Sequence, residues 1–145
     1  MRRLQNELKK MDLSPVENYS VAPVDNNLYH WAGTIFGPVG TPYEGGMFNI
    51  DINITVDYPH KAPKIKFLTR IFHPNISRSG DICVDILKDK WTCALTIDKT
   101  LLSIVSLLGD ANPNDPLEGD IADLYLNDRD EFNRKARQST LKYAN

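Results

Sequence analysis

The spacing of hydrophobic residues changes along the chain, from a helical period to a strand period. Leu4, Leu8 and Met11 recur at helical spacing among basic residues, which predicts a short amphipathic helix. Residues 48–54 instead alternate between apolar and polar, as expected of a strand with one buried and one exposed face. Further strands are predicted over residues 19–24, 29–36 and 64–67. Four successive strands joined by turn-rich segments indicate an antiparallel sheet.

The second half of the chain contains an irregular stretch followed by helices. Residues 71–91 sustain neither period, and an irregular stretch of about twenty residues inside a domain is usually functional. Thr96 is an expected N-cap for a central helix, which a run of large apolar residues predicts to be largely buried. A C-terminal helix is predicted to begin near Asn127 or Asp128. Strands grouped together with helices at both ends predict one α+β domain over residues 1–145.

The composition argues against several classes of function. The chain has 145 residues, of which 41% are hydrophobic and 25% charged, as in ordinary globular domains. A net charge of −2 argues against nucleic-acid binding, and no apolar run has the length of a signal peptide core or a membrane span. Two cysteines and three scattered histidines predict neither a disulfide framework nor a metal site. We therefore expect a monomer without cofactor in a reducing compartment, the cytoplasm, with the nucleus as a second location.

Cys83 is the first candidate for chemistry. A single cysteine is more often a small buried hydrophobic residue than a nucleophile. Three features favour a chemical role: the irregular stretch around it, the preceding Gly80, which permits tight backbone geometry, and the nearby amide of Asn75. From the residues alone, both interpretations remain open.

A longer pattern surrounds this cysteine. It consists of His73-Pro74-Asn75, Gly80, Ile82-Cys83, Asp85-Ile86-Leu87 and Trp91. The pattern resembles the active-site signature of the ubiquitin-conjugating enzymes, and residues 43–46, 57–59 and 112–117 resemble further family segments in the same order. The resemblance implies the family's α+β fold, with an N-terminal helix, a four-stranded antiparallel sheet, a central helix and C-terminal helices. It also implies a transferase without cofactor or metal. Such an enzyme accepts ubiquitin from an activating enzyme as a thioester on Cys83 and passes it to a substrate lysine or to a ligase.

The resemblance also implies roles for residues near Cys83. Asn75 would stabilise the oxyanion of the transfer step, with a turn-stabilising role as the alternative. Asp115 and Asp85 would orient the attacking lysine or accept its proton; the alternatives are a loop cap for Asp115 and a solvated loop acid for Asp85. His73 resembles a structural residue that anchors the loop through a hydrogen bond.

The partners implied are ubiquitin, an ATP-dependent activating enzyme, RING-type or other ligases, and protein substrates. The surface expected to bind the activating enzyme and ligases comprises Arg2, Arg3, His60, Thr92, Cys93 and Ala94. His60 and Cys93 depart from the pattern, since ligase-pairing members commonly have phenylalanine and proline there. A second, noncovalent ubiquitin near Ser20 is a further expectation.

Three other functions stay open. A conjugator of a related modifier would use the same chemistry, although the direct passage from Leu87 to Trp91 without an insertion resembles ubiquitin-transferring members. A catalytically silent binding module of the same fold would lack the cysteine that this chain has. A thiol redox sensor using Cys83 and Cys93 is disfavoured, because no basic residue immediately flanks Cys83 to lower the pKa of its thiol.

Overall fold

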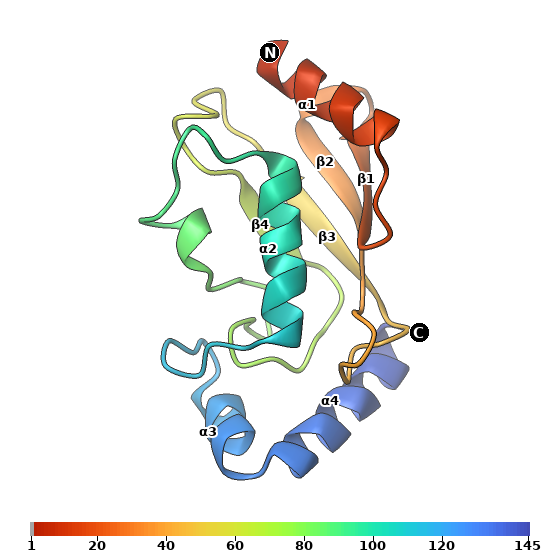
Figure 1. Cartoon of the computed structure of the whole chain (residues 1–145), viewed down its shortest axis with the longest axis vertical. Coiled ribbons are helices and arrows are strands. Elements are labelled where there is room, and N and C mark those ends of the chain that lie inside the picture. Colours follow the sequence, from red (N-terminus) through yellow and green to blue (C-terminus); the bar gives the residue numbers. More distant parts are fainter. Residues whose placement is uncertain (1) are drawn as a thin grey trace.

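The alternating strands form one antiparallel sheet, and the helices surround it. The computed structural model describes residues 2–145 (Figure 1). In chain order the elements are α1 (Arg2–Leu13), β1 (Tyr19–Val24), β2 (Asn27–Phe36), β3 (Met47–Asn53), β4 (Lys64–Phe67), the 3₁₀ helix η1 (Asp85–Leu87), α2 (Ile97–Gly109), α3 (Gly119–Asn127) and α4 (Arg129–Tyr143). The strand order is β1-β2-β3-β4, and every neighbouring pair is antiparallel. The predicted α+β class with an antiparallel sheet is confirmed.

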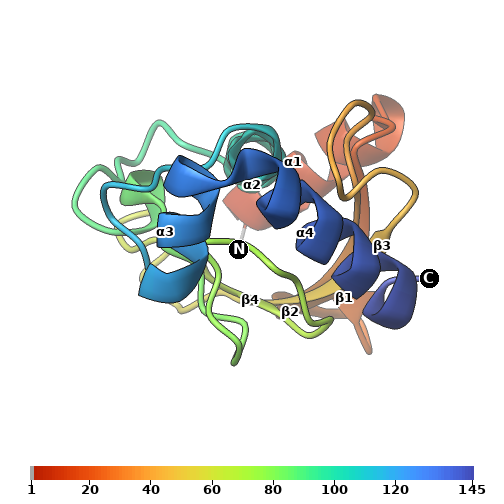
Figure 2. The same ribbon diagram turned by 90° about the horizontal axis from the view of Figure 1, so that it is seen from below.

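One face of the sheet is buried against α2. In β3, Phe48, Ile50 and Ile52 are fully buried, whereas Asn49 and Asn53 on the other face are exposed. The buried residues of α2 are Ile97, Thr100, Leu101, Ile104, Val105, Leu107 and Leu108. Figure 2 shows α2 lying along one side of the sheet. Because burying a large apolar side chain contributes about 1.5–3 kcal/mol, this layer of contacts is the main apolar core of the molecule.

The central helix begins where the sequence predicts. The Thr96 side chain accepts a hydrogen bond from the Lys99 amide at 3.1 Å, so Thr96 is the N-cap of α2. The strand predictions over residues 19–24 and 64–67 match β1 and β4. Within residues 71–91, the structure has isolated bridges and the single turn of η1, in agreement with the predicted irregular stretch.

The C-terminal part holds one helix that the sequence pattern did not delimit. The predicted C-terminal helix is α4, whose N-cap is Asp128, but α3 precedes it directly. The nine residues of α3 bury Ile121 and Ala122, too few to establish a helical period by themselves. No helix among residues 2–145 is long and apolar enough to cross a membrane.

Candidate active site

Cys83 lies almost buried in the irregular stretch, with 6% of the residue exposed. Its backbone amide donates to the Asn75 carbonyl at 2.8 Å, which fixes the chain at this point. Its Sγ donates to Asp115 Oδ2 at 3.2 Å and accepts from Lys88 Nζ at 3.1 Å. The sulfur therefore lies between a carboxylate and an ammonium group.

Lys88 lies five residues after the cysteine and is a basic group beside its sulfur, although no basic residue immediately flanks Cys83 in the sequence. The backbone amides of Lys88 and Lys90 both donate to the Asp85 carbonyl at 3.0 Å, so the chain turns through η1 and brings Lys88 back to the sulfur. The hydrogen bond to Cys83, followed by the charge of that sulfur, raises the pKa of Lys88 above its ordinary value. The residues next to the cysteine in the sequence do not indicate this contact, because the turn of η1 creates it.

His73 anchors the loop to α2. The residue is fully buried; its Nε2 donates to the Leu107 carbonyl of α2 at 2.8 Å, and its Nδ1 accepts from the Asn75 amide at 3.0 Å. Burial lowers the pKa of His73 to about 4, against the smaller opposing effect of the hydrogen bond to Leu107. The ring is therefore neutral at neutral pH, and the expectation that it anchors the loop by hydrogen bonding is confirmed.

Asn75 joins the cysteine segment to the loop that carries Asp115. Its Nδ2 donates to the Asn112 carbonyl at 2.7 Å and to the Asp115 carbonyl at 3.0 Å, while its Oδ1 accepts from the Asn112 amide at 2.8 Å. The residue is fully buried. Both hydrogens of the Asn75 side-chain amide are thus donated to backbone carbonyls. To donate to an oxyanion in the transfer step, Asn75 would have to break one of these two hydrogen bonds. The oxyanion role stays a prediction.

Gly80 has no side chain and so lets the cysteine segment approach β4 closely. Its φ is +96°, and a Cβ at this position would lie 2.0 Å from the Phe67 carbonyl oxygen of β4. The Phe67 amide donates to the Gly80 carbonyl at 2.9 Å. A side chain here would push the cysteine segment away from β4.

The two candidate acids occupy different positions. Asp115 is exposed on the loop before α3 and contacts Sγ from there. That loop is held by Pro74, whose carbonyl accepts from the Leu117 and Glu118 amides at 2.9 and 3.1 Å. Asp85 is also exposed, but the described contacts of Sγ are to Asp115 and Lys88 and not to Asp85. The structure therefore brings together Cys83, Asn75, Asp115 and the unexpected Lys88.

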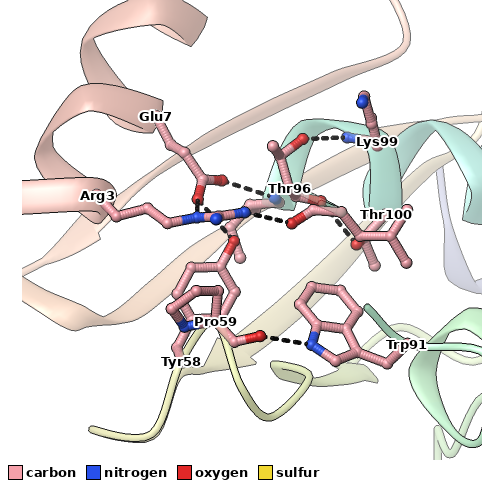
Figure 3. A network of polar contacts seen from close by, with 10 residues as sticks. Arg3, Glu7, Tyr58, Pro59, Trp91, Thr96, Lys99 and Thr100 are labelled. Carbon is pink, nitrogen blue, oxygen red and sulfur yellow. Dashed lines mark hydrogen bonds and ion pairs between the residues drawn. The ribbon is translucent and has the colours of Figure 1, made fainter. Parts of the chain in front are cut away.

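A second cluster lies at the other end of α2, where α1 meets two loops (Figure 3). Glu7 is its centre: its carboxylate accepts from Arg3 Nε at 3.0 Å, from the Tyr58 hydroxyl at 2.7 Å and from the Ile97 amide at 2.8 Å. Arg3 Nη2 also donates to the Leu95 carbonyl at 2.6 Å. This network fixes α1 against the loops before β4 and before α2.

The six residues expected to bind the activating enzyme and ligases lie around this network. Arg2, Thr92, Cys93 and Ala94 are exposed, whereas the Arg3 side chain is 35% exposed and is tied inward by its hydrogen bonds. His60 and Cys93, 33 positions apart, are neighbours, with 3.5 Å between His60 Nδ1 and Cys93 Sγ. Both cysteines are free thiols. The sequence-based grouping of the two loops therefore agrees with their arrangement in space.

Comparisons with known proteins agree with this arrangement. A family model described as ubiquitin-conjugating enzyme matches residues 3–140. Among solved structures, the chain is similar to the E2 domain of a ubiquitin conjugating enzyme from Toxoplasma gondii, with 43% sequence identity and a TM-score of 0.91. The match covers 99% of this chain and 98% of that chain. The similarity thus extends over the sheet, the irregular stretch and the helices alike.

Proposed function

The chain belongs to the ubiquitin-conjugating enzymes, transferases that act through a cysteine thioester, and on this premise we propose that Cys83 carries the modifier. The supporting observation is the position of its sulfur between Asp115 and Lys88, at 3.2 and 3.1 Å, in the loop that His73 anchors. Cys93 is exposed on a different loop beside His60 and, among residues 2–145, has no such contact with a charged group. Family membership implies ubiquitin, an activating enzyme and ligases as partners.

The chemistry explains why a cysteine is needed. A thiolate accepts an acyl group from another thioester with little change in free energy, and the new thioester remains reactive toward an amine. A substrate lysine, with an ordinary pKa of about 10.4, is almost wholly protonated at neutral pH and must lose a proton before it attacks. Asp115 is the residue that orients this lysine or accepts its proton, since its carboxylate already contacts the sulfur.

Asn75 holds this arrangement together. Its amide connects the cysteine segment to the backbone of residues 112 and 115, so it positions the Asp115 carboxylate relative to the sulfur. In the transfer step, the same amide would stabilise the oxyanion if one of its two hydrogen bonds opened. Asp85 acts on the acceptor side of the loop as an exposed acid that attracts the incoming lysine.

The identity of the modifier is tested by loading it onto the enzyme. Incubation with ATP, an activating enzyme and ubiquitin should give an adduct that a thiol reductant removes. Parallel reactions with related modifiers and their own activating enzymes identify a different cargo. A chain that forms no thioester with ubiquitin but forms one with another modifier would overturn ubiquitin as the cargo and keep the chemistry.

The activating enzyme and ligases bind the surface of Arg2, Arg3, His60, Thr92, Cys93 and Ala94. The support is geometric: the Glu7 network joins α1 to both loops (Figure 3), and these elements carry the exposed residues of this surface. Interface energy concentrates in a few buried anchors, commonly aromatic ones. With a histidine and a cysteine at the centre, pairing with ligases that expect phenylalanine should be weak or altered.

A noncovalent ubiquitin binds the exposed face of the sheet around Ser20. Ser20 is exposed on β1 and lies opposite Thr34, which in turn lies opposite Asn49 on β3. This gives a row of small polar side chains on the face away from α2. Chemical shifts of ¹⁵N-labelled enzyme titrated with ubiquitin test the site: perturbations should follow this row and disappear in Ser20→Arg.

The protein acts in the cytoplasm and also in the nucleus. The support is chemical, because thioester transfer needs a reduced thiol, and both cysteines are free. Imaging of a fluorescent fusion tests the location, and retention in an oxidising compartment would contradict it.

A further inference from the structure

Arg78 joins the cysteine segment to the start of α3. Its Nη1 donates to Glu118 Oε1, its Nη2 donates to Asp120 Oδ2 at 3.0 Å, and its backbone amide donates to Glu118 Oε2 at 2.9 Å. We propose that Arg78 and Glu118 are positioning residues for the transfer step, which hold the loop of Asp115 so that its carboxylate stays beside Cys83 Sγ. This inference deepens the proposed function and rests on it, because it concerns the discharge of a thioester on Cys83.

The start of α3 depends on this contact, because the helix does not cap itself. Glu118 is its N-cap, a position where serine, threonine, aspartate and asparagine are preferred, since their short side chains accept from an amide of the first turn. The Glu118 carboxylate makes no such bond and accepts from Arg78 instead. The position of the first turn of α3 is therefore set by a residue 40 positions earlier in the chain.

The Glu118 side chain is the most buried member of this cluster. It is 14% exposed, against 50% for Arg78 and 68% for Asp120. Ion pairs in full contact with water contribute little, but a carboxylate that is largely removed from water needs a partner that neutralises its charge. The planar guanidinium of Arg78 donates to both carboxylates at once, a geometry that a lysine ammonium group does not match.

Asp115 lies between two attachment points of its loop. On one side, the Asn75 side chain holds the backbone of residues 112 and 115. On the other side, Arg78 holds Glu118. The Asp115 carboxylate is exposed and contacts the sulfur at 3.2 Å, so its position depends on that of the loop. Because a displacement of about 1 Å at a reacting centre can lower a rate about a hundredfold, a looser loop should slow the step that uses this carboxylate.

The contact should matter for lysine and not for every nucleophile. A lysine needs a carboxylate that orients it or accepts its proton, because its ordinary pKa is about 10.4. Hydroxylamine is a small nitrogen nucleophile that is unprotonated at neutral pH and needs neither. Loading from the activating enzyme exchanges one thioester for another and involves no ammonium group. Loss of the contact should therefore slow transfer to lysine and leave the other two reactions unchanged.

The chain offers variants that break this contact and a matched control. Alanine at Arg78 or Glu118 keeps the backbone hydrogen bonds from the loop to the Pro74 carbonyl, so the fold should persist. Arg134 and Glu131 form another partly exposed ion pair, within α4. In the described part of the chain, that pair joins no second segment to α4, so Glu131→Ala removes an ion pair without loosening a loop.

The experiment uses the full chain loaded with ubiquitin. After EDTA stops the activating enzyme, the thioester is discharged in a single turnover to free lysine or to hydroxylamine, at a temperature where every variant is fully folded. Arg78→Ala, Glu118→Ala and the double variant should each slow transfer to lysine about tenfold, since all three remove the same contact. Arg78→Lys keeps the charge and should lie between wild type and Arg78→Ala. Loading and discharge to hydroxylamine should stay within twofold of wild type, as should every rate of Glu131→Ala.

A double-mutant cycle shows whether the contact acts through Asp115. In Asp115→Asn, the further change Glu118→Ala should slow transfer to lysine by less than twofold, because no carboxylate is left to position. An unchanged lysine rate in Glu118→Ala, an equal slowing with hydroxylamine, or a full tenfold effect in Asp115→Asn would overturn the inference and leave the proposed function intact. Absence of any thioester on Cys83 in wild type would overturn both.

Discussion

Asn75 uses its whole amide to connect two segments that are far apart in the sequence. Three side-chain hydrogen bonds hold residues 112 and 115 against the cysteine segment, and the residue is fully buried. A net contribution of about 0.5–1.5 kcal/mol for each bond predicts that Asn75→Ala lowers the free energy of unfolding by about 2–4 kcal/mol. The side chain is thus structural, whatever it does in the transfer step.

The same variant tests the oxyanion role. Asn75→Ala should accept the modifier at a rate within twofold of wild type but discharge it to free lysine at least tenfold more slowly, because a lost oxyanion donor affects the amine transfer. Single-turnover assays of both steps, at a temperature where the variant is fully folded, measure the difference. Asn114→Ala, in the same loop and exposed, is the matched control. Equal slowing of both steps would leave Asn75 with its positioning role alone.

The residues and the family resemblance together predicted part of the site and missed part of it. Cys83, Asn75 and Asp115 were expected and lie together. Lys88 was not expected, because its contact arises from the turn of η1 and not from a motif. Nor does the sequence reveal that the Asn75 amide is occupied, since this depends on the loop at residues 112–117 returning to the cysteine segment.

His60 and Cys93, on the two loops beside α1, lead to a prediction about ligase pairing. His60→Phe combined with Cys93→Pro should restore an apolar anchor at the centre of this surface. An aromatic anchor is commonly worth about 2 kcal/mol or more, roughly thirtyfold in affinity, and discharge without ligase should not change. Ligase binding and ligase-stimulated discharge measure the effect.

The control for this pair is His60→Ala with Cys93→Ala, which removes the same polar groups without adding an anchor. The Glu7 network is intact in both double variants, because neither residue takes part in it. If the phenylalanine and proline variant gains nothing over the alanine variant with any ligase that serves typical family members, the argument from these positions is wrong.

The four strands were predicted to within two residues of their bounds, whereas the short helix between α2 and α4 was not delimited. The bounds of β1 and β4 and the N-cap of α2 agree with the sequence. The resemblance implied more than one C-terminal helix, but the residue pattern did not delimit the short helix α3, because its stability comes from α4 and from its ties to the loop, where Arg78 pairs with Glu118 and Asp120. Such contacts between distant segments leave no local pattern.

At the scale of the whole molecule, His73 couples stability to pH. Its pKa is about 4 in the folded state and about 6.5 when unfolded, so both states are neutral above pH 7. As pH falls below 6.5, His73 binds a proton in the unfolded state, whereas in the folded state it stays neutral until about pH 4. This favours unfolding by up to about 3 kcal/mol across that window, at 1.36 kcal/mol per pKa unit.

Replacing His73 by glutamine distinguishes the effect of the histidine on stability from that of the many carboxylates, which also titrate at acidic pH. His73→Gln keeps a donor and an acceptor but has no proton to gain. Urea unfolding at several pH values between 7.5 and 4.5 should therefore show a smaller loss of stability in the variant than in wild type, by about 2.5 kcal/mol over this range. Parallel curves for the two proteins would show that His73 is not buried and neutral.

The central claim is that Cys83 alone carries the modifier. The direct measurement is loading with ATP, an activating enzyme and ubiquitin, analysed with and without a thiol reductant. In wild type and in Cys93→Ser the adduct should disappear on reduction, because it is a thioester on Cys83. In Cys83→Ser it should survive reduction and be cleaved by mild base, as an oxygen ester is. Loss of the adduct in Cys93→Ser, or a reductant-sensitive adduct in Cys83→Ser, would contradict the claim.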